Sequence, residues 1–173
     1  MHGQLTRYTV SGGSVVVKAR SSIHDTETRW QSIAGSVEAD PETLSETGAT
    51  ATISVDMTAF DAGDWLKNRK LKKDLAVDKH PSAEFSLNEL TDVVRQEDGT
   101  FQATAHGVIR WRNREAPVVA TGSGVVASDR IEAVASFDLD VTTLGVTPPK
   151  ILMFKVEKVV SVEVTINATS SSS

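Results

Sequence analysis

DAGDWLKNRKLKKDLAVDKHPSAEF, residues 61–85, is a long interruption in a chain that otherwise alternates like β-strands. The start of this insertion has a helix-like composition, and we expect a short helix around Trp65–Lys72. His80-Pro81 ends any helix and forces extended backbone before Phe85. A long non-strand insertion between two strands usually carries function or covers a cavity. We therefore expect residues 61–85 to belong to a site.

Alternation of apolar and polar residues outside this insertion predicts half-buried strands. In Ala49–Met57 every odd-numbered residue is apolar, whereas the even-numbered residues are Thr, Ser or Asp. The same pattern recurs in Phe101–Arg112 and Arg130–Val141. Further strands are expected at Arg7–Ser11, Ser14–Ser21, Ile33–Ala39, Ala83–Leu90, Pro117–Ala127 and Val156–Ala168.

The connections between these strands are short and carry turn residues. Gly12-Gly13 predicts a two-residue hairpin turn, and Asn113 is expected in a turn because Asn tolerates left-handed backbone. His24–Arg29 and Thr142–Phe154 are expected to be irregular. About eight closely spaced strands indicate an all-β antiparallel sandwich or barrel. A barrel of ~8 strands is wide enough to be filled by side chains or to hold one small ligand.

The composition limits the organisation and the partners. We expect one domain over residues 1–169 and a disordered Ser-rich tail at 170–173. Lys and Arg total 18 against 23 Asp and Glu, and a net charge of -5 argues against nucleic-acid binding. The chain has no cysteine, which excludes disulfides and thiolate chemistry.

No apolar run approaches the roughly 20 residues that a transmembrane helix needs. The first ten residues, MHGQLTRYTV, lack the apolar core of a secretory signal. We therefore expect a cytoplasmic protein, or a periplasmic or secreted one if the chain is a processed form.

Residues typical of catalysis or metal binding are not arranged for either task. The four histidines, at positions 2, 24, 80 and 106, show no metal-ligand spacing. Gly122-Ser123-Gly124 lacks the spacing of a nucleophile elbow, and no phosphate-binding or dinucleotide motif is present. We expect neither an enzyme nor a metal or cofactor.

The basic cluster Lys67–Lys73 leaves three interpretations open. It is a solvated helix or loop face, a charged rim that attracts an anionic or polar head group to a cavity mouth, or a nucleic-acid patch. The overall acidity of the chain opposes the third interpretation.

Residues 61–85 resemble the signature of the YceI-like family, which runs D-T-G, then R-D/N-x-H-L, then D-V-x-K-Y-P with a following aromatic residue. The matching positions are Asp61-Ala62-Gly63, Lys67-Asn68 with Leu71, and Val77-Asp78-Lys79-His80-Pro81 with Ala83 and Phe85. The resemblance extends over nearly the whole chain, through Tyr8-Thr9-Val10, Gly107-Val108-Ile109, Ala116-Pro117-Val118, Phe137-Asp138-Leu139-Asp140, Leu144-Gly145-Val146 and Val159–Ile166.

This resemblance implies an extended eight-stranded antiparallel β-barrel of lipocalin-like form, with residues 61–85 as its lid segment. It also implies that a long isoprenoid-type lipid, such as a polyprenyl chain or an isoprenoid quinone, binds in the lumen. Alternation suggests the following lining residues: Val17, Ala19, Ile53, Val55, Phe60, Trp65, Leu71, Leu75, Phe85, Ala105, Ile109, Phe137, Leu144, Val162 and Val164.

Some positions depart from the family pattern. Lys67 stands where the family usually has Arg, Lys70 where it often has His, and Leu75 where an aromatic residue is usual. Asn113 replaces the usual hairpin Gly, and Thr142 the late Arg. None of these changes breaks strand alternation, so the fold should be kept. The changes near the mouth of the barrel could alter which ligand binds.

Two other functions stay open at this stage, as does a homodimer. The first is a filled barrel without a lipid ligand, acting as a stress-related or protein-interaction module. The second is an enzyme that acts on a lipid or a quinone, for which the sequence offers no converging acid, base or nucleophile.

Overall fold

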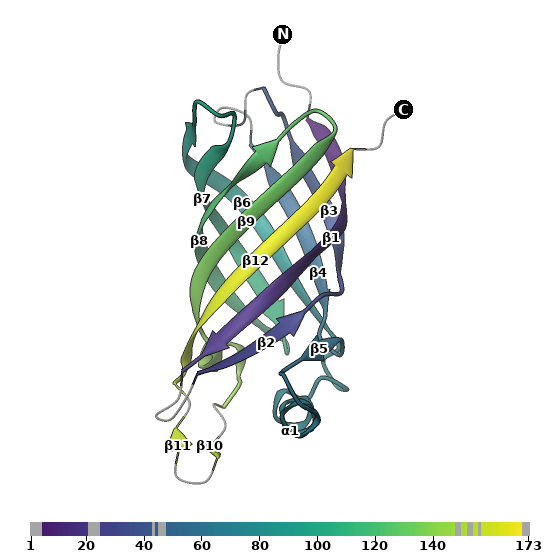
Figure 1. The fold of residues 1–173 in the computed structure, drawn as a ribbon, viewed down its shortest axis with the longest axis vertical. Coiled ribbons are helices and arrows are strands. Elements are labelled where there is room, and N and C mark those ends of the chain that lie inside the picture. Colours follow the sequence, from purple (N-terminus) through teal and green to yellow (C-terminus); the bar gives the residue numbers. More distant parts are fainter. Residues whose placement is uncertain are drawn as a thin grey trace.

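Eight long strands form a closed antiparallel barrel in the computed structural model, which describes residues 5–20, 25–42, 44, 48–147, 150–151, 154–155 and 157–170 (Figure 1). The barrel strands are β1 (Thr6–Ala19), β3 (Ile33–Ala39), β4 (Thr50–Asp56), β6 (Ser82–Arg95), β7 (Phe101–Trp111), β8 (Arg114–Val126), β9 (Arg130–Asp140) and β12 (Val159–Ser170). The other elements are β2 (Thr26–Trp30), β5 (Phe60–Asp61), the helix α1 (Trp65–Leu75), the 3₁₀ turn η1 (Val141–Leu144), β10 (Lys150–Ile151) and β11 (Phe154–Lys155).

The first and last barrel strands close the sheet. β1 pairs with β12 over most of its length, from Tyr8 opposite Ser170 to Lys18 opposite Ser161. The other side of β1 pairs first with β3 and then, nearer its end, with β2. β5 continues the sheet beyond β2. The expected all-β, eight-stranded antiparallel barrel with a helix in the insertion is therefore confirmed.

The hairpin expected at Gly12-Gly13 is wrong, because β1 runs through both glycines as one strand. Its register with β12 shifts between Val10 and Gly12, which is a bulge in the strand. Gly13 has φ +145°, and a Cβ there would lie 2.1 Å from the carbonyl oxygen of Thr165. The glycines thus allow β1 to bend against β12 in place of turning the chain.

Two further expectations need correction. Residues 26–30 are the strand β2 and not part of an irregular segment, since Thr28 and Trp30 are buried and alternate with exposed Glu27 and Arg29. The inward threonines concealed this alternation in the sequence. At the other end, β12 includes Ser170, so the expected tail cannot begin before residue 171; residues 171–173 lie outside the described part of the chain.

The helix α1 begins at the expected residue and ends three residues later than expected. Asp64 is its N-cap and accepts a hydrogen bond of 2.8 Å from the backbone N–H of Lys67. Ala76 adopts the left-handed conformation (φ 52°, ψ 45°), and its N–H bonds to the carbonyl oxygens of Lys72 and Lys73. This C-cap, and not Pro81, ends the helix.

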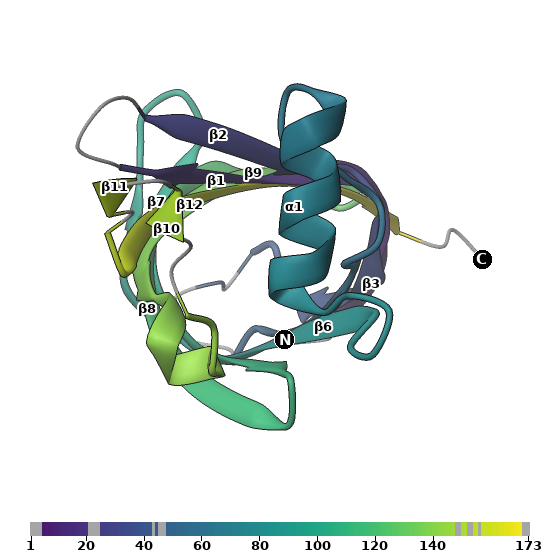
Figure 2. The same cartoon turned by 90° about the horizontal axis from the view of Figure 1, so that it is seen from below.

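The apolar interior has two centres along the barrel axis. One cluster includes Tyr8, Leu44 and Phe101, and the other includes Trp30 and Trp111. The second centre lies at the end of the barrel where α1 is found. Seen along the barrel from this end, α1 runs across one side of the opening (Figure 2).

Candidate ligand-binding cavity

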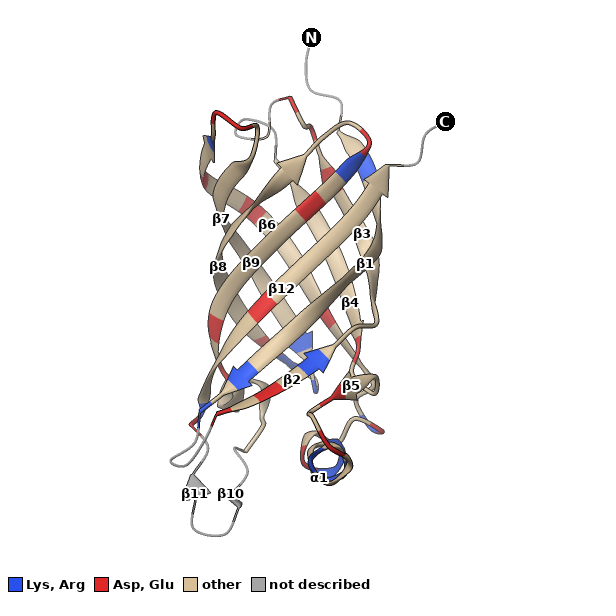
Figure 3. Cartoon of the chain, viewed as in Figure 1, with Lys and Arg blue, Asp and Glu red and all other residues tan. Residues whose placement is uncertain are grey.

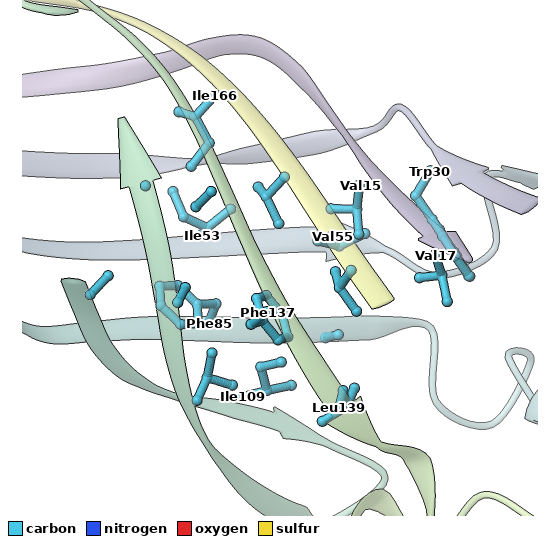
Figure 4. A pocket seen from close by; sticks show the side chains of 18 of the residues that line it. Val15, Val17, Trp30, Ile53, Val55, Phe85, Ile109, Phe137, Leu139 and Ile166 are labelled. Atoms are coloured by element: carbon cyan, nitrogen blue, oxygen red, sulfur yellow. The ribbon is translucent and has the colours of Figure 1, made fainter. Parts of the chain in front are cut away.

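An apolar cavity of about 490 Å³ runs through the barrel between the two clusters. Its wall consists mainly of the inward-facing residues of the barrel strands, which are every second residue along each strand. Side chains from opposite strands point into one shared space, among them Val17 of β1, Phe85 of β6 and Phe137 of β9 (Figure 4). A volume of this size falls within the range of small-molecule sites, roughly 300–1,000 Å³.

Many inward-facing residues of the barrel strands are only half-buried. Because they point away from the outer surface, their remaining exposure is to the lumen. They include Val15, Val17, Val55, Phe85, Ala105, Ile109, Ala135, Phe137, Leu139 and Val164. Small side chains on β7 and β9 leave space that larger residues would fill. The lumen is therefore not closed by its own side chains.

Gly107 contributes to the shape of this wall. A Cβ at position 107 would lie 2.6 Å from the ring of Phe85 and 2.4 Å from the carbonyl oxygen of Ser86. The Phe85 ring thus lies close against the β7 backbone at Gly107. Glycine at this position is required by the close approach of ring and strand.

Two tryptophans lie in the wall near the α1 end with their polar atoms satisfied. The indole N–H of Trp30 donates to the carbonyl oxygen of Met57 at 3.3 Å, and that of Trp111 donates to the carbonyl oxygen of His80 at 2.9 Å. Both residues are under 9% exposed. Their rings can therefore present apolar surface to the lumen at no cost in lost hydrogen bonds.

Ionisable residues contribute to the wall at the α1 end. Among the described wall residues they are Lys67, Lys70, Asp74, Glu84 and Glu157. Lys70 Nζ lies 3.1 Å from Asp74 Oδ2, an ion pair on the inner side of the helix. Elsewhere the wall is almost entirely apolar, so the cavity has one polar end and one apolar end.

The opposite end contains Tyr8, which is fully buried. Its hydroxyl donates a hydrogen bond of 2.6 Å to the carbonyl oxygen of Ala127. Burial raises the pKa of this phenol above its ordinary value of 10.0. The phenol is therefore neutral at physiological pH and serves to join β1 to the β8–β9 turn.

Two side chains hold α1 in place, one at each end of the helix. Asn68 accepts a hydrogen bond from the backbone N–H of Ala62, at the start of the insertion. At the other end of the helix, Arg112 donates to the carbonyl oxygen of Leu75 at 2.6 Å and, with its second terminal nitrogen, to that of Gly145 at 3.4 Å. Arg112 and Asn113 both have positive φ (57° and 61°), the geometry of a two-residue hairpin turn. The Asn turn expected at position 113 is therefore present.

Most of the proposed lining residues lie on the cavity wall. These are Val17, Ala19, Ile53, Val55, Leu71, Leu75, Phe85, Ala105, Ile109, Phe137, Leu144, Val162 and Val164. Whether they contact a ligand stays a prediction. Of the positions that depart from the family pattern, Lys67, Lys70 and Leu75 also lie on the wall.

Phe60 and Trp65 do not line the cavity. Phe60 is on β5, outside the barrel proper, and its ring lies 5.8 Å from that of Trp30. It borders a separate polar depression with Glu27, Arg29 and Asp61. Trp65 is the first residue of α1 and points to solvent, with 68% of its surface exposed. Alternation could not place either residue, since neither belongs to a barrel strand.

Several wall residues were missed as ligand candidates. Leu139 and Ile166 follow the same alternation as residues that were selected, so the pattern could have identified them. Thr28 lies on β2 within the segment His24–Arg29 that was expected to be irregular, and Trp30 directly follows that segment. Their one signal was the short alternation of Thr26, Thr28 and Trp30.

The sequence matches the profile of the YceI-like domain over residues 8–169. The chain belongs to the YceI-like family. A comparison with curated protein sequences gave no match.

Solved structures of YceI-like form share the fold at low sequence identity. Burkholderia cenocepacia BcnA is 17% identical, with a TM-score of 0.72 over 91% of this chain and 96% of its own. A polyisoprenoid binding domain from Saccharophagus degradans, implicated in plant cell wall breakdown, is 8% identical, with a TM-score of 0.72 over 97% of this chain and all of its own (100%). A Campylobacter jejuni YceI protein is 10% identical, with a TM-score of 0.68 over 87% and 88%. At these identities the likeness establishes the fold alone.

No helix in the described part of the chain has both the length and the apolarity to span a membrane. No group of three or more His, Asp or Glu side chains in the same part of the chain is placed to hold a metal ion.

Proposed function

We propose that this YceI-like chain binds and carries a long-chain isoprenoid lipid, a polyprenyl chain or an isoprenoid quinone, with the tail in the barrel lumen. The observation that carries the proposal is the open, apolar cavity, whose wall residues stay half-buried because they face unfilled space. The polyisoprenoid binding domain among the structural neighbours supports the choice of ligand class.

The polarity of the cavity suggests how such a ligand would lie. Its apolar wall favours an unfunctionalised tail, and each buried CH₂-sized unit contributes about 0.8 kcal/mol. The head group then lies at the α1 end, beside Lys67, Lys70 and Asp74. A long tail can in this way bind tightly with few polar contacts.

We favour a binding protein over an enzyme, with the lipid as ligand and no cofactor. Lys67, Lys70 and Asp74, the ionisable wall residues on α1, lie at the mouth of the cavity. Lys70 and Asp74 are paired with each other, and Glu84 is paired with Arg110, 3.9 Å away on the outer wall. No nucleophile with an adjacent base is found among the described wall residues. The open cavity also disfavours a filled barrel that acts without a ligand.

Extraction of the purified protein with organic solvent, followed by mass spectrometry, tests this proposal. We expect a long-chain isoprenoid to co-purify with the chain, or added polyprenols to be taken up by chain that was stripped of lipid. Repeated absence of any bound apolar compound, together with no uptake of polyprenols, would contradict the proposal.

A further inference from the structure

The outward face of α1 combines exposed apolar side chains with a cluster of cations. Trp65 is 68% exposed and Leu66 is 61% exposed, side by side at the start of the helix. Neighbouring exposed apolar side chains rimmed by polar residues can mark a membrane or protein interaction site. α1 also has no buried residue, and most of its side chains are exposed.

Helical spacing separates the two faces of α1. Leu71, Asp74 and Leu75 are half-buried and line the cavity. At 3.6 residues per turn, the opposite side carries a different set. We call these residues the α1 outer face: Trp65, Leu66, Arg69, Lys72 and Lys73, all of them exposed.

The α1 outer face is positively charged in an acidic protein. Residues 65–73 hold five of the 18 Lys and Arg and none of the 23 Asp and Glu, which leaves 13 basic against 23 acidic residues in the rest of the chain. Figure 3 shows basic residues on α1 at one end of the barrel, with further Lys and Arg on β1, β2 and other strands. Lys72 has an acidic neighbour, Asp78 at 3.8 Å, but both side chains are more than half exposed and such pairs are weak.

We propose that the α1 outer face docks the mouth of the barrel onto an anionic lipid bilayer. An exposed Trp and Leu insert among the head groups, while flanking Lys and Arg meet anionic phosphates and extend their apolar stems along the surface. The position of α1 beside the opening would place the cavity mouth against the membrane, where an apolar ligand could pass without crossing water.

The charge of this face favours a bilayer over a protein partner. The centres of protein interfaces are depleted in Lys. Self-association through the α1 outer face would bring Arg69, Lys72 and Lys73 of one copy against those of another. A bilayer with anionic lipids has the complementary charge, and its depth accommodates the two apolar side chains.

Tryptophan fluorescence and vesicle sedimentation test the docking. Trp30 and Trp111 are 5% and 7% exposed, so a change of emission on adding vesicles reports on Trp65. The vesicles are phosphatidylcholine alone, or phosphatidylcholine with phosphatidylglycerol in a three-to-one ratio. We expect sedimentation and a blue shift with the anionic vesicles only. Both should weaken between about 0.1 M and about 1 M salt, as the Debye length falls from about 10 Å to about 3 Å.

Variants of the α1 outer face separate charge from insertion. Arg69→Gln, Lys72→Gln and Lys73→Gln should each weaken partitioning by about fivefold. Leu66→Ser should weaken it as well, and Trp65→Phe should remove the blue shift while keeping the sedimentation. The matched controls are Arg7→Gln, Arg95→Gln and Arg130→Gln at the opposite end of the barrel and Val119→Ser on its wall, which should bind as the wild type does.

Three results would overturn the docking proposal. The first is equal binding to neutral and anionic vesicles, or binding to neither. The second is that the α1 variants and the control variants have equal effects on vesicle binding. The third is that Leu66→Ser changes the oligomeric mass of the protein and leaves vesicle binding unchanged. The measurement does not depend on what the cavity holds. A variant that loses vesicle binding but still co-purifies with lipid would support docking separately from carriage.

Discussion

Arg112 Nη1 donates a hydrogen bond of 2.6 Å to the carbonyl oxygen of Leu75, the last residue of α1. The last carbonyls of a helix lack partners within the helix, and a cation there also complements the helix dipole. The second terminal nitrogen of Arg112 reaches Gly145, so one guanidinium joins the helix to the turn after η1. The position of the helix over the mouth thus depends on a side chain from the β7–β8 turn.

Replacing Arg112 with Met should loosen this attachment. Hydrogen bonds from a charged donor contribute about 1.5–3 kcal/mol, and we expect the free energy of unfolding to fall by about 2 kcal/mol in urea titrations. Release of a fluorescent long-chain lipid should also be faster. Arg110→Met is the matched control, since Arg110 is exposed on the outer wall, and it should change stability by less than about 0.5 kcal/mol. Equal effects of the two variants would argue against the attachment.

The side chain of Asn68 should stabilise the backbone at the start of the insertion. Its side-chain oxygen accepts the backbone N–H of Ala62, a residue that is 7% exposed. In Asn68→Ala that buried N–H loses its partner, at a cost of about 1–3 kcal/mol in the free energy of unfolding. Arg69→Ala, one residue along the exposed side of the helix, should leave stability within about 0.5 kcal/mol. A neutral Asn68→Ala variant would show that water replaces the side chain.

A large residue in the lumen should block the ligand. Ala105 faces the cavity, so Ala105→Phe places a ring in the space that the lipid tail would occupy. We expect uptake of a polyprenol to fall at least tenfold, equivalent to about 1.4 kcal/mol. Val119→Phe adds a ring on the outer wall, where Val119 is 63% exposed, and uptake should be unchanged. Circular dichroism of both variants should confirm that the barrel has folded.

The protein should lose stability in acid through three similar turns. In Asp56, Asp98 and Asp140, a hydrogen bond from the hydroxyl of the threonine two residues later, supported by that residue's backbone N–H, lowers the carboxyl pKa below 3.8. Because the pKa of each carboxyl is lower in the folded than in the unfolded protein, the stabilisation is complete at a pH above the pKa of the unfolded state. It is lost as the pH falls through the pKa values of the folded state.

Removing the three hydroxyls should therefore reduce the acid sensitivity. The variant Thr58→Val, Thr100→Val, Thr142→Val should be less stable than the wild type at pH 7, and the difference should shrink as the pH falls below 3.8. Urea midpoints across this pH range measure the effect, and carboxyl-carbon NMR titrations measure the three pKa values. A constant difference at all pH values would contradict this account.

Local patterns were sufficient for much of the fold. In β4, β7 and β9 each inward-facing residue could be read from alternation, because a strand side chain has just two faces to choose from. The helix start at Asp64 also follows from local chemistry, since a capping carboxylate needs only the next turn of its own chain. The family motif can likewise be identified within one short segment, residues 61–85.

Contacts between distant residues decided the rest. Gly12-Gly13 suits both a turn and a bend, and the approach of the Thr165 carbonyl oxygen selects the bend. Trp65 and Leu71 are both apolar residues of one helix, and the position of α1 over the barrel mouth turns Leu71 inward and Trp65 to solvent.

The sequence by itself thus determined the clearly alternating strands and the all-β class, because alternation is local, and the motif in residues 61–85 indicated the family and with it the barrel. The tertiary structure alone decided that the lumen stays open. The free volume depends on how eight strands close around small side chains, and no single segment contains that information.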